Sequence, residues 1–167
     1  AAQWNRGTDW PFNPSDINFV ILTHAHVDHC GLIPELYRQG FEGLVYCTHE
    51  TAQLADLQLR DVAKLPSVAF EERDVLRVRF HTPGGPKNPT LGGHHPLADN
   101  LFARFFPTAH LIGAASVTIL WGPPDSPNQG SIVFSGDIGP GKEDNEARPI
   151  DRHLMHPKPG DFAVIEP

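Results

Sequence analysis

Residues 17–22 form a short apolar run that leads directly into side chains of types that bind metal ions, namely His24, His26, Asp28 and His29. The apolar run predicts a buried strand, and a strand backbone is rigid up to its last residue. In an irregular loop after a strand, alternate side chains can turn toward one point. We therefore expect His24 and His26 to face one point. Asp28 and His29 would then face another, which suits two adjacent metal ions.

The chemistry of this cluster fits a zinc-like ion. Imidazole offers a neutral nitrogen ligand, and the carboxylate of Asp28 offers a hard oxygen and a compensating charge. The alternative is an ordinary surface loop that happens to be rich in histidine. The position of the cluster argues against that alternative, because it lies between an apolar strand and an amphipathic helix, where unpartnered polar groups would destabilise the fold.

The segments after the cluster alternate between helix and strand patterns. Residues 29–38 carry apolar side chains at helical spacing, and Gly40 stands where a left-handed C-cap belongs. Residues 44–47 predict a strand, and Thr48 predicts the N-cap of a helix that runs to about Leu65. Strand, helix, strand, helix is the opening of an α/β fold.

The middle and the end of the chain are less regular. Residues 75–80 favour a strand, whereas residues 82–100 are rich in Pro and Gly and predict a long loop. Residues 116–121 predict a further strand, and residues 162–165 form a last apolar run that we interpret as a buried strand. A buried strand needs partners at both edges. This ending and the lack of a strand before residue 17 predict a piece of a longer protein.

Two later strands each deliver one more ligand-type side chain. Residues 101–106 predict a strand followed by His110, and residues 131–135 predict a strand followed by Asp137. The glycines at positions 136 and 139 would let the backbone turn sharply around Asp137. Each residue alone is weak evidence, since a histidine or an aspartate after a strand is commonly a turn residue. Together with the first cluster they complete a set of candidate ligands.

Length, charge and cysteine content narrow the class of protein. A chain of 167 residues fits one domain, which we expect to span residues 1–167. Its net charge of −7 argues against a domain that holds nucleic acid mainly through a basic surface. Cys30 and Cys47 are too few for a disulfide framework, which favours the cytoplasm. We expect no membrane span, because no stretch approaches the roughly 18 apolar residues that one needs.

Four motifs in order, THAHVDHCGLIPEL, TAHLIGAAS, VFSGDIG and VIEP, resemble the metallo-β-lactamase superfamily. Within it they are most similar to the β-CASP group of RNA-processing nucleases. The resemblance covers residues 16–166. It implies an α/β fold of the metallo-β-lactamase type, an αββα sandwich with metal ions on loops at one edge of the two sheets. We expect the sandwich to be incomplete at both ends of this chain, with the β-CASP insertion beginning near residue 166.

The resemblance also implies a role for each ligand: His24, His26 and His110 would bind one metal ion, Asp28 and His29 a second, and Asp137 would bridge the two. Glu166 matches the first acidic motif of the β-CASP insertion. The chain departs from the family pattern in several respects, two of which concern its C-terminal side. A histidine ligand that the family carries after the inserted domain has no counterpart here, and Pro167 follows Glu166 at once.

The function implied by the resemblance is that of a zinc-dependent hydrolase, a ribonuclease that cleaves single-stranded RNA. Two zinc ions would hold a bridging hydroxide and clamp the attacking and leaving oxygens of an in-line displacement. Asp28 would be a ligand and also the catalytic residue that orients the attacking water. A homo-oligomer is compatible with this prediction. Two alternatives stay open: a small-molecule esterase or lactamase-like hydrolase, and a metal-binding fragment that is catalytically incomplete.

Overall fold

The computed structural model describes residues 9–85, 92–108, 110–123, 126, 128–138 and 162–165. The chain divides into two compact units, with unit 1 spanning Ala1–Thr82 and unit 2 spanning Pro83–Pro167. Each unit contains a sheet of its own, and helices lie in unit 1, so the expected α/β class is confirmed. The assignment of residues 1–167 to one domain stays a prediction.

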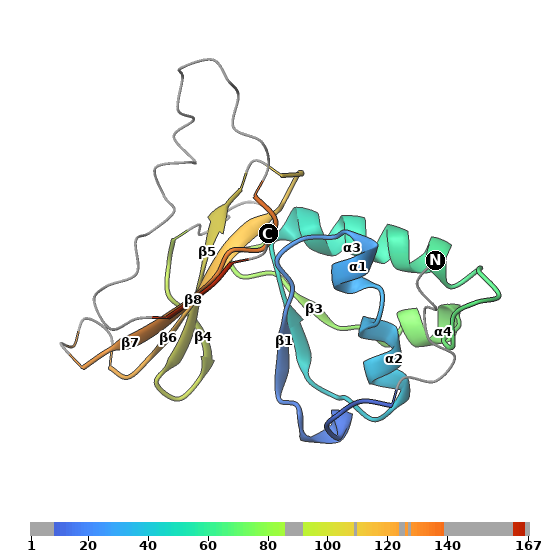
Figure 1. Ribbon diagram of the computed structural model, residues 1–167, viewed down its shortest axis with the longest axis horizontal. Coiled ribbons are helices and arrows are strands. Elements are labelled where there is room, and N and C mark those ends of the chain that lie inside the picture. The colour runs from blue at the N-terminus through green and yellow to red at the C-terminus, as the bar shows by residue number, and fades with distance from the viewer. Residues whose placement is uncertain are drawn as a thin grey trace, which may run out of the picture. The chain divides into compact units, whose positions relative to one another are not determined.

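The sheet of unit 1 has three parallel strands in sequence order. They are β1 (Phe19–Ile21), β2 (Leu44–Tyr46) and β3 (Phe80–His81). A short 3-10 helix, η1 (Pro14–Asp16), precedes β1. The helices of this unit lie on one side of its sheet, as parallel strands require for their crossover connections (Figure 1). The strand predicted at residues 17–22 and the strand predicted at 44–47 are therefore confirmed, each somewhat shorter than expected.

The single helix expected at residues 29–38 is wrong, because the segment forms two helices. These are α1 (Val27–Cys30) and α2 (Ile33–Arg38). Pro34 lies in the first turn of α2, where its missing N–H group is tolerated, but the same residue inside a continuous helix would remove a hydrogen bond. The chain therefore restarts the helix at Ile33. Gly40 follows α2 with a φ of 105°, the left-handed conformation that its position predicted.

The next two helices follow two different capping patterns. In α3 (His49–Val62), Thr48 caps the N-terminus as predicted, and its hydroxyl accepts from the Thr51 N–H at 3.2 Å. The strand expected at residues 75–80 is largely wrong. Its first residue ends a helix, α4 (Glu72–Val75), and only β3 at its end is a strand. The reason is a reciprocal capping box between Glu71 and Asp74, which satisfies backbone N–H groups at the start of α4. The spacing of apolar residues does not reveal such a cap.

Tyr37 joins α2 to the sheet of unit 1. Its hydroxyl donates to the Gly43 carbonyl at 2.7 Å and accepts from the Arg79 N–H at 3.1 Å. Both cysteines of this unit are free and fully buried. Burial raises the pKa of the Cys47 thiol to about 12. The two thiols are therefore packed core groups.

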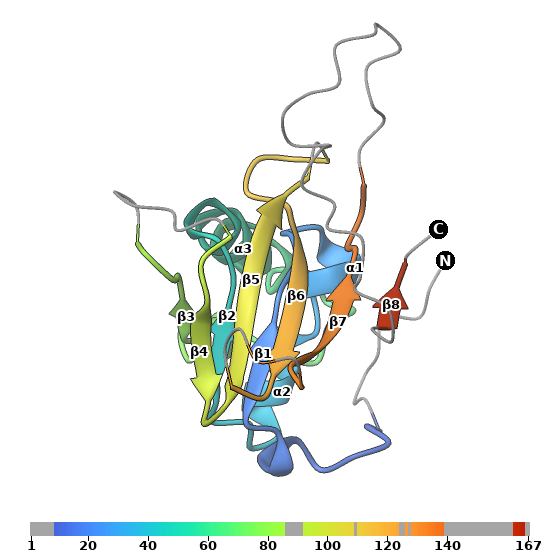
Figure 2. The same cartoon turned by 90° about the vertical axis from the view of Figure 1, so that its left-hand side faces the viewer.

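The sheet of unit 2 has the strand order β4-β5-β6-β7-β8 (Figure 2). Its strands are β4 (His95–Ala98), β5 (Leu101–Pro107), β6 (Ala115–Trp121), β7 (Gly130–Phe134) and β8 (Phe162–Val164). Neighbouring strands are antiparallel except β7 and β8, which are parallel. The three strands expected at 101–106, 116–121 and 131–135 are confirmed. The long loop expected at 82–100 is wrong in part, because β4 pairs with β5 across a short turn.

The last strand, β8, is exposed, so its predicted burial is wrong. Phe162 is 64% exposed and Val164 is 45% exposed. The apolar sequence did give a strand, but β8 lies at the edge of the sheet and pairs with β7 alone among the described strands. Apolar composition favours strand pairing, whereas burial also needs a second layer over the strand.

Glu35 carries a buried charge in α2. Its side chain is 1% exposed, and Arg38 donates to its two carboxylate oxygens at 2.7 and 2.6 Å. Burial alone would raise the pKa of Glu35. Hydrogen bonds from Arg38 and Gln39, together with the positive charge of Arg38, outweigh burial and hold the pKa below its usual value.

We predict that Glu35→Gln lowers the free energy of unfolding at neutral pH by about 1 to 3 kcal/mol, because a charge-assisted pair on a buried carboxylate is lost. Since the pKa of Glu35 is lowered on folding, its contribution is complete above the unfolded-state pKa. It disappears as the pH falls through the folded-state pKa. Urea unfolding at neutral pH and during stepwise acidification measures both effects.

Asp61→Asn is the matched control, because Asp61 pairs with Lys64 on the surface, where the two side chains are 69% and 74% exposed. Little or no change is expected for this exposed pair. Equal losses in the two variants, or an unchanged acid profile in Glu35→Gln, would contradict the prediction.

Candidate metal centre

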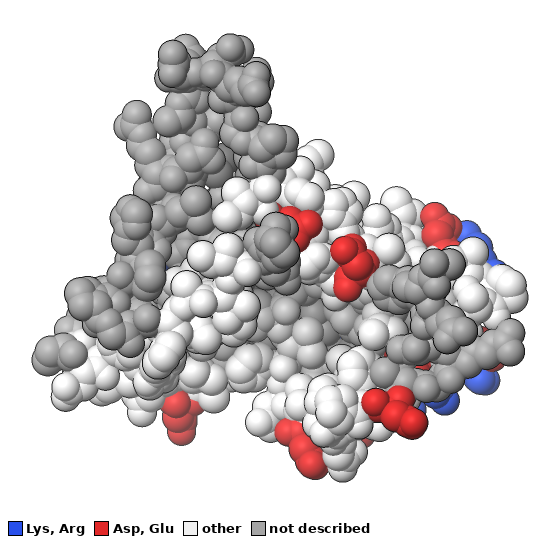
Figure 3. All heavy atoms as spheres, viewed as in Figure 1, with Lys and Arg blue, Asp and Glu red and all other residues white. Residues whose placement is uncertain are grey.

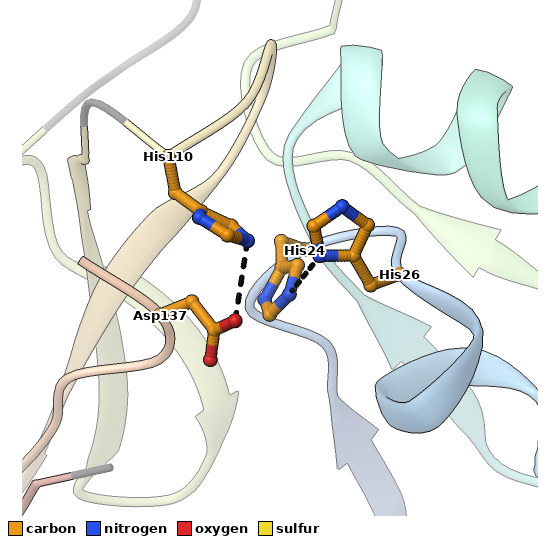
Figure 4. Close-up of side chains that lie close together, drawn as sticks. All are labelled: His24, His26, His110 and Asp137. Atoms are coloured by element: carbon orange, nitrogen blue, oxygen red, sulfur yellow. Dashed lines mark hydrogen bonds and ion pairs between the residues drawn. The ribbon is translucent and has the colours of Figure 1, made fainter. Parts of the chain in front are cut away.

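The loop after β1 holds the first pair of predicted ligands. His24 is fully buried, and its Nε2 lies 3.2 Å from Nδ1 of His26 (Figure 4). On the other side of the His24 ring, the Thr23 hydroxyl lies 3.1 Å from Nδ1. That contact occupies Nδ1, so Nε2 is the nitrogen of His24 that faces His26. Unit 1 thus brings His24 and His26 together, as the sequence predicted.

Asp28 and His29 lie in α1, which begins directly after His26. The Asp28 side chain is 65% exposed, and its Oδ2 is 3.8 Å from Nε2 of His29. The His29 ring packs on the His24 ring with centroids 4.0 Å apart. The second predicted pair is therefore adjacent to the first, but it is more open to solvent.

Unit 2 brings together the other two predicted ligands. Nε2 of His110 lies 3.2 Å from Oδ2 of Asp137 (Figure 4). The two residues follow different strands: His110 is the third residue after β5, which ends at Pro107, and Asp137 is the third residue after β7, which ends at Phe134. His24 likewise is the third residue after the end of β1. The prediction that His24, His110 and Asp137 each follow a strand is confirmed.

The backbone turns of unit 2 depend on glycine beside each ligand. Gly136, which precedes Asp137, has a φ of 54°, and Gly113, which follows His110, has a φ of 82°. Both values lie in the left-handed region that glycine adopts without steric cost. The sharp turn expected before Asp137 is therefore present, whereas residue 139 lies outside the described residues, as does Glu166.

Thr108 is a site residue that the sequence reasoning missed. Its hydroxyl donates to the carbonyl oxygen of Asp137 at 3.2 Å, and its N–H donates to Ala114 at 2.8 Å. The loop that carries His110 is thereby tied to the loop that carries Asp137. A hydroxyl two residues before a candidate ligand is the only sequence signal for this role, and many threonines share it.

Three further histidines, which also have side chains that can bind metal, contact aromatic rings. The His94 ring contacts Phe102, with centroids 5.9 Å apart, and the His95 ring contacts Phe105 at 6.0 Å. His81 at the end of β3 packs on Tyr46 at 4.9 Å. His153 and His156 lie outside the described residues.

The donor atoms of each pair have the spacing of neighbouring ligands on one ion. Ligand atoms about 2.0 to 2.1 Å from a tetrahedral zinc ion lie roughly 3.3 Å from one another. The His24–His26 pair and the His110–Asp137 pair both have a separation of 3.2 Å. Without an ion, the same separation makes a hydrogen bond or an ion pair. Each unit thus offers two neighbouring donor atoms of a possible coordination shell. The donors are nitrogen and oxygen atoms of the kinds that divalent ions accept.

Comparison with known proteins identifies the superfamily of the chain. Residues 3–108 match the family model described as the metallo-beta-lactamase superfamily. The matched region includes β1, the ligand loop after it and β5. The match confirms the superfamily and the metallo-β-lactamase type of fold that the motifs predicted.

Curated relatives share similar stretches of sequence. Ribonuclease TTHA0252 of Thermus thermophilus is 33% identical over 135 residues, which is 80% of this chain and 28% of the relative. An RNase J-like protein of Methanocaldococcus jannaschii is 30% identical over 125 residues, covering 75% of this chain and 26% of the relative. The transcription termination factor FttA of the same organism is 40% identical over 76 residues, 42% of this chain and 12% of the relative. The chain therefore spans less than a third of the length of these relatives.

Among solved structures, the Rm3 metallo-beta-lactamase aligns with a TM-score of 0.47 and 19% identity, covering 75% of this chain and 43% of that one.

In the part of the chain that the structure describes, none of the helices has the length and apolar character needed to cross a membrane.

We predict that Thr108→Val weakens the binding of a divalent ion by about tenfold, because groups that position metal ligands typically contribute 10- to 100-fold to affinity. The substitution keeps the volume of the side chain and removes the hydroxyl that holds the Asp137 loop. Competition with a chromogenic chelator for zinc, and the visible spectrum of the cobalt-loaded chain, measure the effect.

Thr108→Ser is the control, since serine keeps the hydroxyl and should bind metal as the wild type does. A valine variant with wild-type affinity and an unchanged cobalt spectrum would show that Thr108 does not position the site. A thermal unfolding scan of both variants separates loss of ligand geometry from loss of fold.

Proposed function

The chain belongs to the metallo-β-lactamase superfamily, and on that premise we propose that it is a metal-dependent ribonuclease that hydrolyses single-stranded RNA. The observation that carries the proposal is that each unit holds a pair of donor atoms close to strand ends. In each pair the two atoms are as far apart as two neighbouring ligands of a zinc ion. In the proposed site His24, His26 and His110 hold one ion, Asp28 and His29 hold a second, and Asp137 is shared between them.

The ions would be zinc, because imidazole nitrogen dominates the donor set and carboxylates complete it. Bound divalent ions lower the pKa of water toward neutrality and balance the negative charge that develops at a phosphodiester during in-line displacement. The protein side chains would then have separate duties. The exposed carboxylate of Asp28 can accept a proton from the attacking water, and the Thr23 hydroxyl fixes the orientation of the His24 ring.

RNA as the substrate is supported by the names of two relatives, a ribonuclease and an RNase J-like protein. It is also supported by the motifs that resemble the β-CASP group. The distribution of charged side chains on the surface restricts how RNA could be bound. On the face that Figure 3 shows, acidic side chains are scattered and the basic ones lie near the helices of unit 1. Since this face has no continuous basic surface among its described residues, capture of RNA through its phosphates alone would be weak.

The proposed setting is the cytoplasm, where the two free and buried cysteines would stay reduced. Self-association into a homo-oligomer is part of the proposal that size-exclusion chromatography with light scattering can test. This chain spans only 28% of the length of the ribonuclease that it resembles. The activity, substrate and partners of the whole protein are therefore proposed as well.

The test is cleavage of an end-labelled single-stranded RNA by the zinc-loaded chain. Removal of metal with a chelator should lower the rate by more than about 100-fold, and zinc should restore it. Asp137→Ala should lose at least one bound ion and the activity with it, since it removes the shared carboxylate. Asp99→Ala is the control, because Asp99 is exposed in the turn between β4 and β5.

Three outcomes would contradict the proposal. Retention of two ions in Asp137→Ala would argue against the dinuclear site. Turnover of a chromogenic lactam or ester without RNA cleavage would indicate a small-molecule hydrolase. One tightly bound ion with no hydrolysis of any phosphodiester would indicate a catalytically incomplete metal-binding fragment.

A further inference from the structure

The backbone carbonyls on the two sides of the His26 α-carbon both accept hydrogen bonds from α1. His26 is the residue directly before this helix (Figure 4). Its own carbonyl oxygen accepts from the N–H of His29 at 3.0 Å and from the N–H of Cys30 at 2.9 Å. The preceding carbonyl, that of Ala25, accepts from the Cys30 thiol, whose Sγ lies 3.3 Å from the oxygen. The two peptide planes that flank His26 are therefore each tied to α1.

These two peptide planes set the direction in which the His26 side chain leaves the backbone. Each plane is rigid, so the backbone of His26 has only the dihedral angles φ and ψ, which are −62° and 147°. With both planes held, the freedom that the imidazole keeps is rotation about its own side-chain bonds. The separation of 3.2 Å between Nδ1 of His26 and Nε2 of His24 thus depends on the contacts with α1.

Cys30 has the geometry of a donor to the ligand loop. A carbonyl oxygen only accepts hydrogen bonds, so the thiol is the donor to Ala25. The Cys30 side chain is 0% exposed and Ala25 is 1% exposed, so the contact is buried from water. A buried carbonyl that lacks a donor is unfavourable. Because Sγ is directed at this carbonyl and has no exposed surface, Cys30 acts on the ligand loop and is not itself a ligand.

We infer that Cys30 is a positioning residue of the metal centre. Its thiol and its N–H hold the peptide planes on the two sides of His26, and they thereby direct the imidazole of His26 toward an ion shared with His24. The inference rests on the part of the proposed function in which these two histidines bind one ion. It does not depend on RNA as the substrate.

Loss of the thiol should weaken metal binding, and a hydroxyl should restore it. Cys30→Ala should lower the affinity for zinc by about five- to tenfold, a modest effect for a group that positions a ligand, because S–H is a weak donor. Cys30→Ser should recover most of the affinity. Competition with a chromogenic chelator measures the affinity. The visible spectrum of the cobalt-loaded chain reports the ligand geometry, and it should change in the alanine variant but not in the serine variant.

Cys47→Ala is the matched control. Cys47 is equally buried in the same core cluster, and among the described residues it makes no side-chain hydrogen bond to the ligand loop. The control removes the same side-chain volume, so it should lose similar packing and still bind zinc and cobalt as the wild type does. Equal losses of affinity in the two alanine variants, or a serine variant that binds as weakly as Cys30→Ala, would overturn the inference.

The infrared S–H stretching band tests the hydrogen bond directly, and it does so even if Cys30→Ala does not fold. The chain has two cysteines, so Cys47→Ala keeps Cys30 as its only thiol. Its band should lie at a lower wavenumber than that of an alkyl thiol in a hydrocarbon solvent, because donation weakens the S–H bond. A band at the wavenumber of the unbonded thiol would overturn the inference.

The same band tests whether the thiol and the metal site are coupled. An ion that binds through His26 should in turn change the hydrogen bond that holds this residue, because coupling between two sites is reciprocal. Addition of zinc should therefore move the Cys30 band in Cys47→Ala and leave the Cys47 band in Cys30→Ser in place. A Cys30 band that zinc does not move would overturn the positioning role.

The inference and the proposed function can fail separately. If zinc affinity depends on Cys30 as described but the zinc-loaded chain cleaves no RNA, the proposed function fails and the inference stands. If the chain cleaves RNA while Cys30→Ala binds zinc with wild-type affinity, the function stands and the inference fails.

Discussion

Backbone hydrogen bonding at the ends of strands determines where the candidate metal-ligand side chains of this protein can lie. His24, His110 and Asp137 are each the third residue after a strand, and those strands are β1, β5 and β7. The paired strand holds the start of each loop, and only a few backbone angles separate it from the ligand. Side-chain contacts then complete the positioning, with Thr23 beside His24 and Thr108 beside the Asp137 carbonyl. The proposed metal chemistry depends on this short, supported path from strand to ligand.

Recognition of RNA by the proposed site would depend on local contacts and not on overall charge. Metal ions held by the candidate ligands would attract the phosphodiester. A chain with a net charge of −7 gains little from nonspecific attraction to RNA. Contacts at the proposed metal centre would therefore have to supply much of the affinity for RNA.

Apolar patterns predicted the strands of this fold better than its short helices. The runs at residues 101–106, 116–121 and 131–135 became β5, β6 and β7, because alternating and bulky apolar residues pack well in a sheet. The break between α1 and α2, just before Pro34, and the capping box of α4 both depend on local hydrogen bonding at single residues. Strand β4 was not predicted, because it is defined by its pairing with β5. The residues around it are rich in Pro and Gly, which favoured a loop.

The sequence by itself determined the types of the candidate ligands, their order and the places of His24, His110 and Asp137 after strands, because these follow from local composition and from the rigidity of a strand end. The superfamily resemblance came from the same residues. Tertiary structure decided the rest: that His24 meets His26 through Nε2 and Nδ1, that Thr108 holds the Asp137 loop and that β8 is exposed. These features arise from segments that are distant in the chain or from side-chain orientation, and the pattern of residue types along a sequence does not encode either one locally.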